Sequence, residues 1–350
     1  MASSQKSVDV TVRGAGIFGL SIAWACALRG AAVQVVDPFG AGSGSSGGQV
    51  GALAPHVPEN WNPKKAFQLD SLLIAGEFWA GVETAGGVSS GYGRLGRLQP
   101  LADDKAVALA HGREGTARAL WEDNAVWEVI PAAEAGSWAP VSASGLLVRD
   151  TLTARMNPRR ACAALVAALA ARGVKVQPEA EDAGQVLWAT GWRGLKELSE
   201  ALGKNVGTGV KGQSVSLRYD AGEVPQIYAE GLHVVPHVDG TVAVGSTSER
   251  DFDDPTATDD QCEALIARAA LAVPALQGAE VIERWAGVRP RARSRAPMLG
   301  AWPGREGHFI ANGGFKIGFG MGPKVAQVMA DLLLDGHDAI PEGFRVEDSL

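Results

Sequence analysis

The fold is decided by one stretch, Val8-Asp-Val-Thr-Val-Arg-Gly-Ala-Gly-Ile-Phe-Gly-Leu-Ser-Ile-Ala-Trp-Ala-Cys-Ala-Leu-Arg-Gly-Ala-Ala-Val-Gln-Val-Val-Asp37. Its alternating valines predict a β-strand over 8–12, and apolar residues at helical spacing predict an α-helix that stops at Gly30. A second strand over 32–36 ends in the acid Asp37. Strand, glycine turn, helix, strand and acid, in this order, predict a site for an adenine dinucleotide.

The three glycines of this turn have separate physical tasks. Gly14 makes the tight turn, Gly16 lets backbone N–H groups approach a diphosphate, and Gly19 lets the helix pack closely on the strand. The diphosphate then lies at the positive end of the helix dipole. Asp37, about 20 residues further on, can accept hydrogen bonds from ribose hydroxyls and would repel a 2′-phosphate. A purely structural turn is the alternative, since the chain contains 45 glycines, but the surrounding elements favour the dinucleotide.

The composition is that of a large globular chain with an acidic balance. At 350 residues and 46% hydrophobic content, the chain exceeds what one core usually serves, so two closely joined domains are expected. The net charge of −7 argues against nucleic acid or an anionic membrane as a partner, because binding to such partners normally shows as a basic excess.

Cysteine usage and the amino terminus suggest the compartment. Cys26, Cys162 and Cys262 stand far apart without paired spacing, which favours buried, reduced thiols. Residues 1–7 lack the apolar core of a secretion signal, and no apolar run reaches membrane-spanning length. We therefore expect a cytoplasmic protein without a membrane partner, and no metal site is predicted.

A loop rich in glycine and serine follows Asp37 over 38–56. A flexible linker is one interpretation, but linkers occupy polar surface, whereas this loop runs directly into the apolar segment 50–54. Small residues allow a ligand to lie against the backbone. The loop is therefore predicted to bind the cofactor together with the first glycine turn.

Hydrophobic periodicity predicts the remaining elements. Helices are expected over 65–79, 103–111, 157–173, 259–271 and 324–334, and strands over 93–100, 146–149, 174–176, 185–191, 211–219, 227–244, 279–285 and 308–312. Asn157 and Pro158 mark the start of one helix and Gly173 its end. The last helix follows a glycine-rich turn, which predicts a second helix amino terminus near the cofactor.

Four separated motifs carry a resemblance to one family. They are Gly14-Ala-Gly-Ile-Phe-Gly19 with Asp37, the loop Ser45-Ser-Gly-Gly-Gln49, the segment Gly287-Val-Arg-Pro-Arg291, and the turn Gly313-Gly-Phe-Lys-Ile-Gly318. In this order the chain resembles the FAD-dependent D-amino acid oxidase superfamily, and within it the branch of glycine oxidase and sarcosine oxidase. The resemblance covers nearly the whole chain.

The resemblance implies an α/β fold with a discontinuous Rossmann-type FAD-binding domain and a second, mainly antiparallel-sheet substrate domain. The FAD-binding domain would comprise 1–85, 146–205 and 287–350, and the substrate domain 86–145 and 206–286. The implied cofactor-binding residues are Gly14, Ala15, Gly16, Ile17, Phe18, Gly19, Asp37, Pro38, Ser45, Ser46, Gly47, Gly48, Gln49, Ala189, Gly191, Gly313, Gly314, Phe315, Lys316, Ile317 and Gly318. No cysteine lies near the Arg289 segment, where sarcosine oxidase-like relatives attach the flavin, so FAD is expected to be noncovalent.

Three residues are expected at the substrate. Arg289 stands in the Gly-x-Arg-Pro context in which relatives bind the substrate carboxylate, and a guanidinium suits a carboxylate bidentately. Lys316 occupies a position where relatives often have a basic residue, and His233 replaces a tyrosine of glycine oxidase-like enzymes. For His233 a structural role in the sheet is an equal alternative.

Two arginine patterns have no functional assignment from the sequence. Arg13 precedes the first glycine, where an apolar residue is usual. Arg289, Arg291, Arg293 and Arg295 alternate, so an extended segment would place all four on one face. A solvated basic strand or a phosphate-facing patch is the alternative for the whole series, and the later arginines are expected to be surface or structural residues.

The activity implied by the resemblance is oxidation of the C–N bond of a small amino or imino acid by hydride transfer to flavin N5, followed by hydrolysis of the imine. Oxygen or another acceptor would take the electrons. Alternatives are a tRNA-modifying flavin amine oxidase and a flavin-binding protein without turnover. The substrate, the physiological acceptor and the oligomeric state are not predicted by the sequence.

Overall fold

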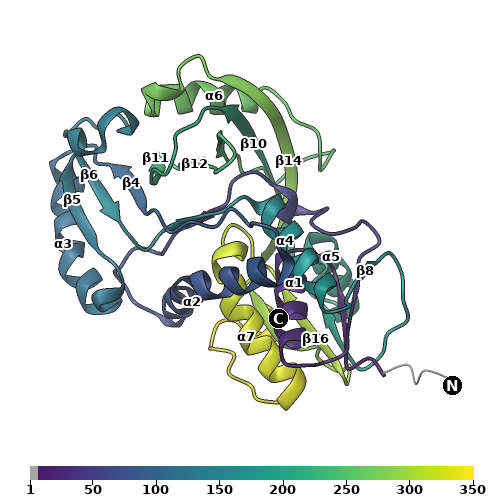
Figure 1. The fold of residues 1–350 in the computed structure, drawn as a ribbon. Helices are drawn as coiled ribbons and strands as arrows, with labels where there is room; N and C mark the ends of the chain where they lie inside the picture. Colours follow the sequence, from purple (N-terminus) through teal and green to yellow (C-terminus); the bar gives the residue numbers. More distant parts are fainter. Residues whose placement is uncertain (1–6) are drawn as a thin grey trace.

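The computed structural model describes residues 7–350 and is built around two large sheets (Figure 1). Six strands form the first sheet, and neighbours pair in parallel except β15 with β16. In order they are β15 (Met298–Ala301), β16 (His308–Asn312), β9 (Gln185–Trp188), β1 (Val10–Arg13), β2 (Val33–Val36) and β8 (Val176–Gln177). Parallel strands need crossover connections, and here these include helices.

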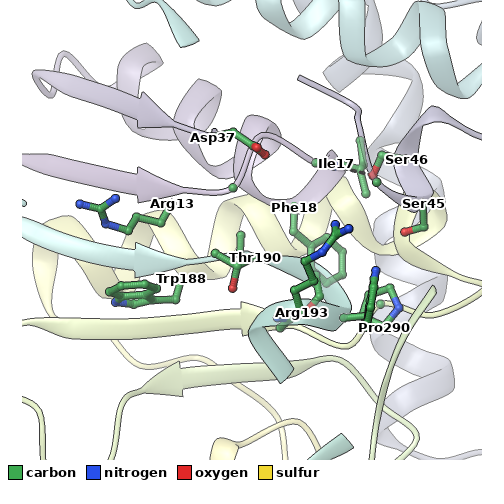
Figure 2. A pocket seen from close by; sticks show the side chains of 18 of the residues that line it. Arg13, Ile17, Phe18, Asp37, Ser45, Ser46, Trp188, Thr190, Arg193 and Pro290 are labelled. Atoms are coloured by element: carbon green, nitrogen blue, oxygen red, sulfur yellow. Dashed lines mark hydrogen bonds between the residues drawn. The ribbon is translucent and has the colours of Figure 1, made fainter. Parts of the chain in front are cut away.

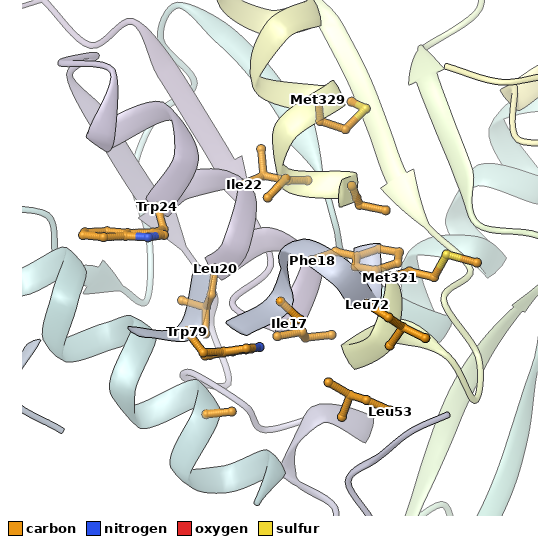
Figure 3. Close-up of a cluster of buried hydrophobic side chains, with 14 of the residues drawn as sticks. Ile17, Phe18, Leu20, Ile22, Trp24, Leu53, Leu72, Trp79, Met321 and Met329 are labelled. Carbon is orange, nitrogen blue, oxygen red and sulfur yellow. The ribbon is translucent and has the colours of Figure 1, made fainter. Parts of the chain in front are cut away.

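Four helices pack against one another beside this sheet: α1 (Ile17–Leu28), α2 (Pro63–Gly86), α4 (Pro158–Ala171) and α7 (Gly318–Asp335). Nearly every residue of α1 is buried. Figure 3 shows the shared apolar cluster, with Ile17, Leu20, Ile22 and Trp24 from α1, Leu72 and Trp79 from α2, and Met321 and Met329 from α7. Each such side chain contributes roughly 1.5–3 kcal/mol on full burial, so the cluster fixes the amino end of α1.

The second sheet has eight strands and is mainly antiparallel, with β11 and β4 as its parallel pair. Its strands are β14 (Glu280–Ala292), β10 (Gly207–Arg218), β13 (Thr241–Gly245), β12 (Leu232–Pro236), β11 (Gln226–Ala229), β4 (Arg97–Pro100), β6 (Leu146–Asp150) and β5 (Trp127–Pro131), in that order. Two further helices, α3 (Asp104–Trp121) and α6 (Gln261–Ala272), pack on it. The predicted α/β fold with a Rossmann-type sheet and a second antiparallel sheet is confirmed.

Short elements complete the chain. Strand β3 (Ala52–Leu53) pairs with β7 (Ala154–Arg155), and α5 (Gly191–Leu202) follows β9. Short 3₁₀ segments occur at Ser45–Gly47, Glu122–Asn124, Ala132–Trp138, Pro274–Leu276 and Val346–Ser349, and the one at Ala132–Trp138 is interrupted at Gly136.

The strands of the first sheet come from three separated parts of the sequence, around 10–36, 176–188 and 298–312. All three lie inside the segments proposed for the FAD-binding domain. Two strands do not fit the proposed boundaries. Strand β6 lies inside the proposed FAD-binding segment but pairs with β4 and β5 in the second sheet, and β14 crosses the boundary at 287 and stays in the second sheet to Ala292. The division into domains itself remains a proposal.

Most expected elements occur, and some have different bounds. Asn157 caps α4, Pro158 is its first residue, and Gly173 follows its end in a left-handed conformation, as predicted. The expected start of the last helix at Lys324 is wrong, because α7 begins at Gly318 and includes Pro323. The hydroxyl of Ser71 on α2 accepts a hydrogen bond from the Lys324 N–H, which offsets part of the irregularity caused by the proline.

Within residues 7–350, none of the helices combines the length and the apolar character that crossing a bilayer would require. The expectation that the chain lacks a secretion signal rests on residues 1–7, and residues 1–6 lie outside the described part.

Candidate active site

The turn between β1 and α1 is held by very close backbone approaches. Gly14 has a positive φ of 104°, and a side chain on it would come within 2.3 Å of the Ala189 carbonyl oxygen. A Cβ on Gly19 would lie 1.9 Å from the Gly14 carbonyl oxygen. The predicted roles of these two glycines therefore have a direct steric basis. Gly16 begins α1, and its Cβ position faces the Ser46 hydroxyl at 3.2 Å.

Asp37 closes the same turn from the end of β2. Its carboxylate accepts hydrogen bonds from the N–H groups of Ala15 at 2.8 Å and Phe39 at 2.9 Å. Each carboxylate oxygen keeps further lone pairs, and the residue lines the cavity in front of the turn. Asp37 can therefore order the protein backbone and accept ligand hydroxyls together.

Replacing Asp37 by alanine is expected to weaken FAD binding by roughly 1–3 kcal/mol, because charged hydrogen bonds to the ribose are lost. FAD titration of the apoprotein by flavin fluorescence measures the change. Asp9→Ala is a matched control, since Asp9 accepts a similar bond from the Ala32 N–H at 2.7 Å at the opposite end of β1. Equal FAD dissociation constants for the wild type and the Asp37 variant would contradict the ribose assignment.

The loop over 38–56 is fixed between the two sheets. The Ser46 hydroxyl accepts a hydrogen bond from the Ile17 N–H at 3.0 Å and so caps α1. Gln49 is buried and accepts a bond from the Ser214 hydroxyl at 3.0 Å. These contacts are those of a structured wall, and a flexible linker does not fit them.

One cavity runs along the carboxyl ends of the strands of the first sheet, as Figure 2 shows with Arg13 and Trp188 at one end and Ser45 and Ser46 at the other. Ligands of open α/β sheets bind at this edge. The predicted residues that line it are Gly14, Gly16, Ile17, Phe18, Asp37, Pro38, Ser45, Ser46, Ala189, Gly191, Gly313, Gly314, Phe315 and Gly318. The predicted residues that do not line it are Ala15, Gly19, Gly47, Gly48, Gln49, Lys316 and Ile317, together with Arg289 and His233.

The sequence analysis missed several residues of the cavity wall. They include Val36, Phe39, Ser43, Gly44, Thr190, Trp192, Arg193, Glu197, Val288, Pro290, Ala311 and Asn312, and also Arg13 and Trp188. Many follow the ends of β9 and β16, so their place after two buried strands was the available signal. The guanidinium of Arg193 lies 4.8 Å from the ring centroid of Phe39 and 5.0 Å from that of Trp192. Among residues 7–350 no carboxylate pairs with Arg193, so its charge is available to an anionic ligand.

The unusual Arg13 is explained by long-range partners. Its Nε lies 2.6 Å from an Asp182 carboxylate oxygen, and its Nη2 donates to the Ala180 carbonyl oxygen at 2.9 Å. The guanidinium also lies 5.5 Å from the Trp188 ring centroid. An arginine at this position therefore ties the end of β1 to the segment before β9.

The glycine-rich turn before α7 closes the cavity near α1. Side chains on Gly313 and Gly314 would come within 2.6 Å of the Ala292 Cβ and 2.8 Å of the Phe18 ring. Phe315 adopts a left-handed φ of 44°, and the turn is held by the Asn312 amide, which donates to the Gly191 carbonyl oxygen at 2.9 Å. This geometry places the amino terminus of α7 at the cavity, six residues earlier in sequence than expected.

Arg289 lies on β14 and is mostly buried. Its Nη1 donates to the Ser246 hydroxyl at 2.7 Å, and its Nη2 donates to the carbonyl oxygens of Thr247 at 2.6 Å and Lys211 at 3.3 Å. Its Nε is buried without an acceptor among the described residues, and no carboxylate there forms an ion pair with it. Burial lowers the pKa of Arg289 to about 10. A fixed cation with donors to spare suits an anionic ligand.

Three cationic groups surround the Phe315 ring. The guanidinium carbons of Arg289 and Arg291 lie 5.6 and 5.7 Å from its centroid, and the Lys316 ammonium lies at 5.8 Å. Partial burial, and then the charge of Arg289, lower the pKa of Lys316. We call Arg289, Arg291 and Lys316 the Phe315 cation cluster.

His233 lies on β12 with its ring centroid 4.7 Å from that of Tyr228. Burial lowers its pKa to about 3, with smaller contributions from the cations Arg97 and Lys316. Arg97 is itself paired with Asp150 at 2.8 Å, whereas the Nδ1 of His233 has no partner within residues 7–350. The imidazole is therefore neutral at ordinary pH.

The four arginines do not share one extended segment, and Arg293 and Arg295 are exposed. Arg289 and Arg291 belong to β14, but the strand ends at Ala292 and the chain turns. Arg293 donates to the Leu350 carbonyl oxygen at 3.0 Å, and Arg295 has a left-handed φ of 63°. The turn redirects the last two side chains because they are no longer in an extended segment.

The residues of the cavity fit FAD by steric and chemical criteria. The glycines of the first turn let the backbone of the turn pack closely on its neighbours, backbone N–H groups converge at the start of α1, and an acid ends β2. The amino terminus of α7 adds positive electrostatic potential at the far wall. This set of groups corresponds to what a diphosphate, a ribose and an electron-rich ring require.

Comparison with known proteins assigns the chain. A model of the family described as FAD dependent oxidoreductase matches residues 9–332. Glycine oxidase of Pseudomonas putida is 28% identical over 370 residues, covering 96% of this chain and 99% of that protein. The structure of glycine oxidase from Geobacillus kaustophilus has a TM-score of 0.84 at 22% identity, covering 97% of this chain and 98% of that one. Iminodiacetate oxidase from Chelativorans sp. BNC1 has a TM-score of 0.83 at 21% identity, covering 96% and 98%.

The family match spans nearly the whole described chain, and the motifs that carried the resemblance meet around one cavity. The chain belongs to the FAD-dependent oxidoreductases of the D-amino acid oxidase superfamily, in the glycine oxidase-like branch, and its cofactor is FAD.

Proposed function

We propose that this enzyme oxidises the C–N bond of a small amino or imino acid. The observation that carries the proposal is Arg289, a mostly buried guanidinium without a carboxylate partner in the described chain, on the face of β14 opposite to Val288 and Pro290 of the cavity wall. Burying a charge is costly unless a counterion joins it, so the site favours a carboxylate-bearing substrate. The relatives named glycine oxidase support the same substrate class.

We assign the following roles to the residues of the chain. Gly14 to Gly19, Asp37 and the turn at Gly313 would hold FAD, which supplies the two-electron acceptor when bound. Arg289 would fix the substrate carboxylate. The neutral His233, which pairs with Gly245 across β12 and β13, would bond the amine without adding charge. Orientation of this kind lowers the barrier without a side-chain base.

The products follow from atom and electron balance. Loss of a hydride and a proton converts the amine to an imine, and water then hydrolyses the imine to a carbonyl compound and an amine or ammonia. Oxygen, giving hydrogen peroxide, or another acceptor would take the two electrons from the reduced enzyme.

A screen of the purified yellow protein tests the proposal. Glycine, sarcosine, proline and D-amino acids are each offered in a peroxide-coupled assay and in a dye-coupled assay. We expect turnover of at least one of them, and anaerobic bleaching of the flavin absorption by the same compound. Absence of bleaching with all of these compounds and with iminodiacetate would refute the proposed function and favour a flavin-binding protein without turnover.

A second candidate is oxidation of an amine carried on RNA. A groove beside the end of β14 is lined by Lys204, Arg291, Arg293 and Arg295, and a row of cations suits backbone phosphates. The net charge of −7 opposes this candidate. A band-shift titration with tRNA at low salt decides it: binding would support the candidate, and no shift would exclude it.

A further inference from the structure

The Phe315 cation cluster carries more positive charge than one carboxylate can neutralise. Arg289, Arg291 and Lys316 each lie within 6 Å of one ring centroid. These groups interact electrostatically. The charge of Arg289 lowers the pKa of Lys316, and the charge of Lys316 lowers the pKa of His233.

The protein itself does not neutralise the cluster. Within residues 7–350, none of its three cations forms an ion pair with a carboxylate. Glu249 is the acid whose charge raises the pKa of Arg289, and its carboxylate lies 3.8 Å from the ammonium of Lys211. The charged group that perturbs Lys316 is the cation Arg289. Neighbouring cations in a partly buried site repel one another, and this repulsion favours a ligand with more than one negative charge.

Arg289 and Lys316 differ in what they can still bind. Arg289 is fixed by Ser246, Thr247 and Lys211 and points its remaining donors in set directions. The Lys316 ammonium makes no hydrogen bond to another described residue, and the residue is exposed. A flexible ammonium beside a rigid guanidinium can therefore reach a second acidic group at a variable distance from the first.

We propose that the preferred substrate is an amino or imino acid with a second acidic group, bound by Lys316 while Arg289 binds the first carboxylate. This inference rests on the proposed function and narrows its substrate class to dicarboxylic amines. The solved relative named iminodiacetate oxidase has the same fold, which agrees with a fold able to accept such a molecule.

Two other uses of Lys316 predict different kinetics. If Lys316 and Arg289 bind the same carboxylate, removal of Lys316 weakens the binding of every carboxylated substrate by the same factor. If Lys316 stabilises charge on the reduced cofactor, its removal lowers kcat for every substrate equally. Only if Lys316 binds a second carboxylate does its removal reduce kcat/KM for dicarboxylic substrates more than for monocarboxylic ones.

The experiment compares iminodiacetate with sarcosine on the FAD-loaded enzyme, in the wild type and in Lys316→Met. We expect the wild type to favour iminodiacetate in kcat/KM by about tenfold or more, the effect of one charge-assisted bond. In Lys316→Met the kcat/KM for iminodiacetate falls by about tenfold, chiefly through KM, and that for sarcosine changes by less than about threefold. Lys316→Arg retains the preference.

Lys175→Met serves as the control, because Lys175 is an exposed lysine that precedes β8 and lies outside the cavity wall. A wild type that prefers sarcosine or glycine, or equal losses for both substrates in Lys316→Met, would overturn the inference and leave the proposed function intact. Failure of every amino and imino acid to bleach the flavin would instead refute the proposed function.

Discussion

Replacing Arg289 by methionine is expected to lower kcat/KM for the amino acid substrate by roughly two to four orders of magnitude. The substrate carboxylate would lose charge-assisted hydrogen bonds in a desolvated site, where removing one partner of a charge pair costs about 3–5 kcal/mol. Most of the loss should appear in KM. Steady-state kinetics measure it, and the visible flavin spectrum checks that FAD is retained.

Control variants distinguish the loss of carboxylate binding from a general loss of structure. Arg218→Met removes another arginine from the same pair of strands, where Arg218 and Glu280 form an exposed ion pair that contributes about 0–1 kcal/mol. It should leave kcat/KM unchanged. Arg289→Lys keeps the charge but loses the planar fork, so an intermediate loss is expected.

A structural role of Arg289 must also be distinguished, because its guanidinium bonds the backbone of Lys211 and Thr247. Gly212→Ala provides a second test of the same assignment. Its Cβ would lie 2.2 Å from the Nη2 of Arg289, so the guanidinium must move although it is still present. KM should rise in this variant too. Retained flavin with wild-type kcat/KM in both Arg289→Met and Gly212→Ala would contradict the carboxylate assignment.

The first glycine turn could be predicted from sequence because its rules are local. Strand, turn and helix lie within 8–37, and Gly19 packs against Gly14 and Val12, which the same motif supplies. The steric contact between Gly19 and Gly14 is of this kind. The same reasoning located the cap of α4 at Asn157, where side chain and backbone interact over three residues.

The parts that sequence reasoning missed depend on distant partners. Arg13 is neutralised by Asp182, 169 residues away, and nothing near Arg13 in the sequence indicates that acid. The start of α7 was misplaced because glycines and Pro323 disfavour a helix locally, whereas packing of this segment on α1 and α2 favours it. Arg193 enters the cavity only because α5 starts at the edge where β9 ends.

Exchanging Gly19 for alanine is expected to destabilise the protein by about 3 kcal/mol and to weaken FAD binding. The new Cβ would lie 1.9 Å from the Gly14 carbonyl oxygen and 3.3 Å from a Val12 methyl group, so α1 must move away from β1. That movement shifts the N–H groups at the start of α1 out of the cradle. Urea unfolding and flavin fluorescence titration measure the two effects.

Gly81→Ala is the matched control and should act in the opposite direction. Gly81 lies inside α2, and its Cβ position has no atom of the described chain within 4 Å. Alanine is preferred over glycine in a helix interior by about 1 kcal/mol, so this variant should unfold at higher urea concentration with FAD affinity unchanged. If Gly19→Ala also gained stability, helix propensity would outweigh the contact, and close packing of α1 on β1 would not be what requires glycine at this position.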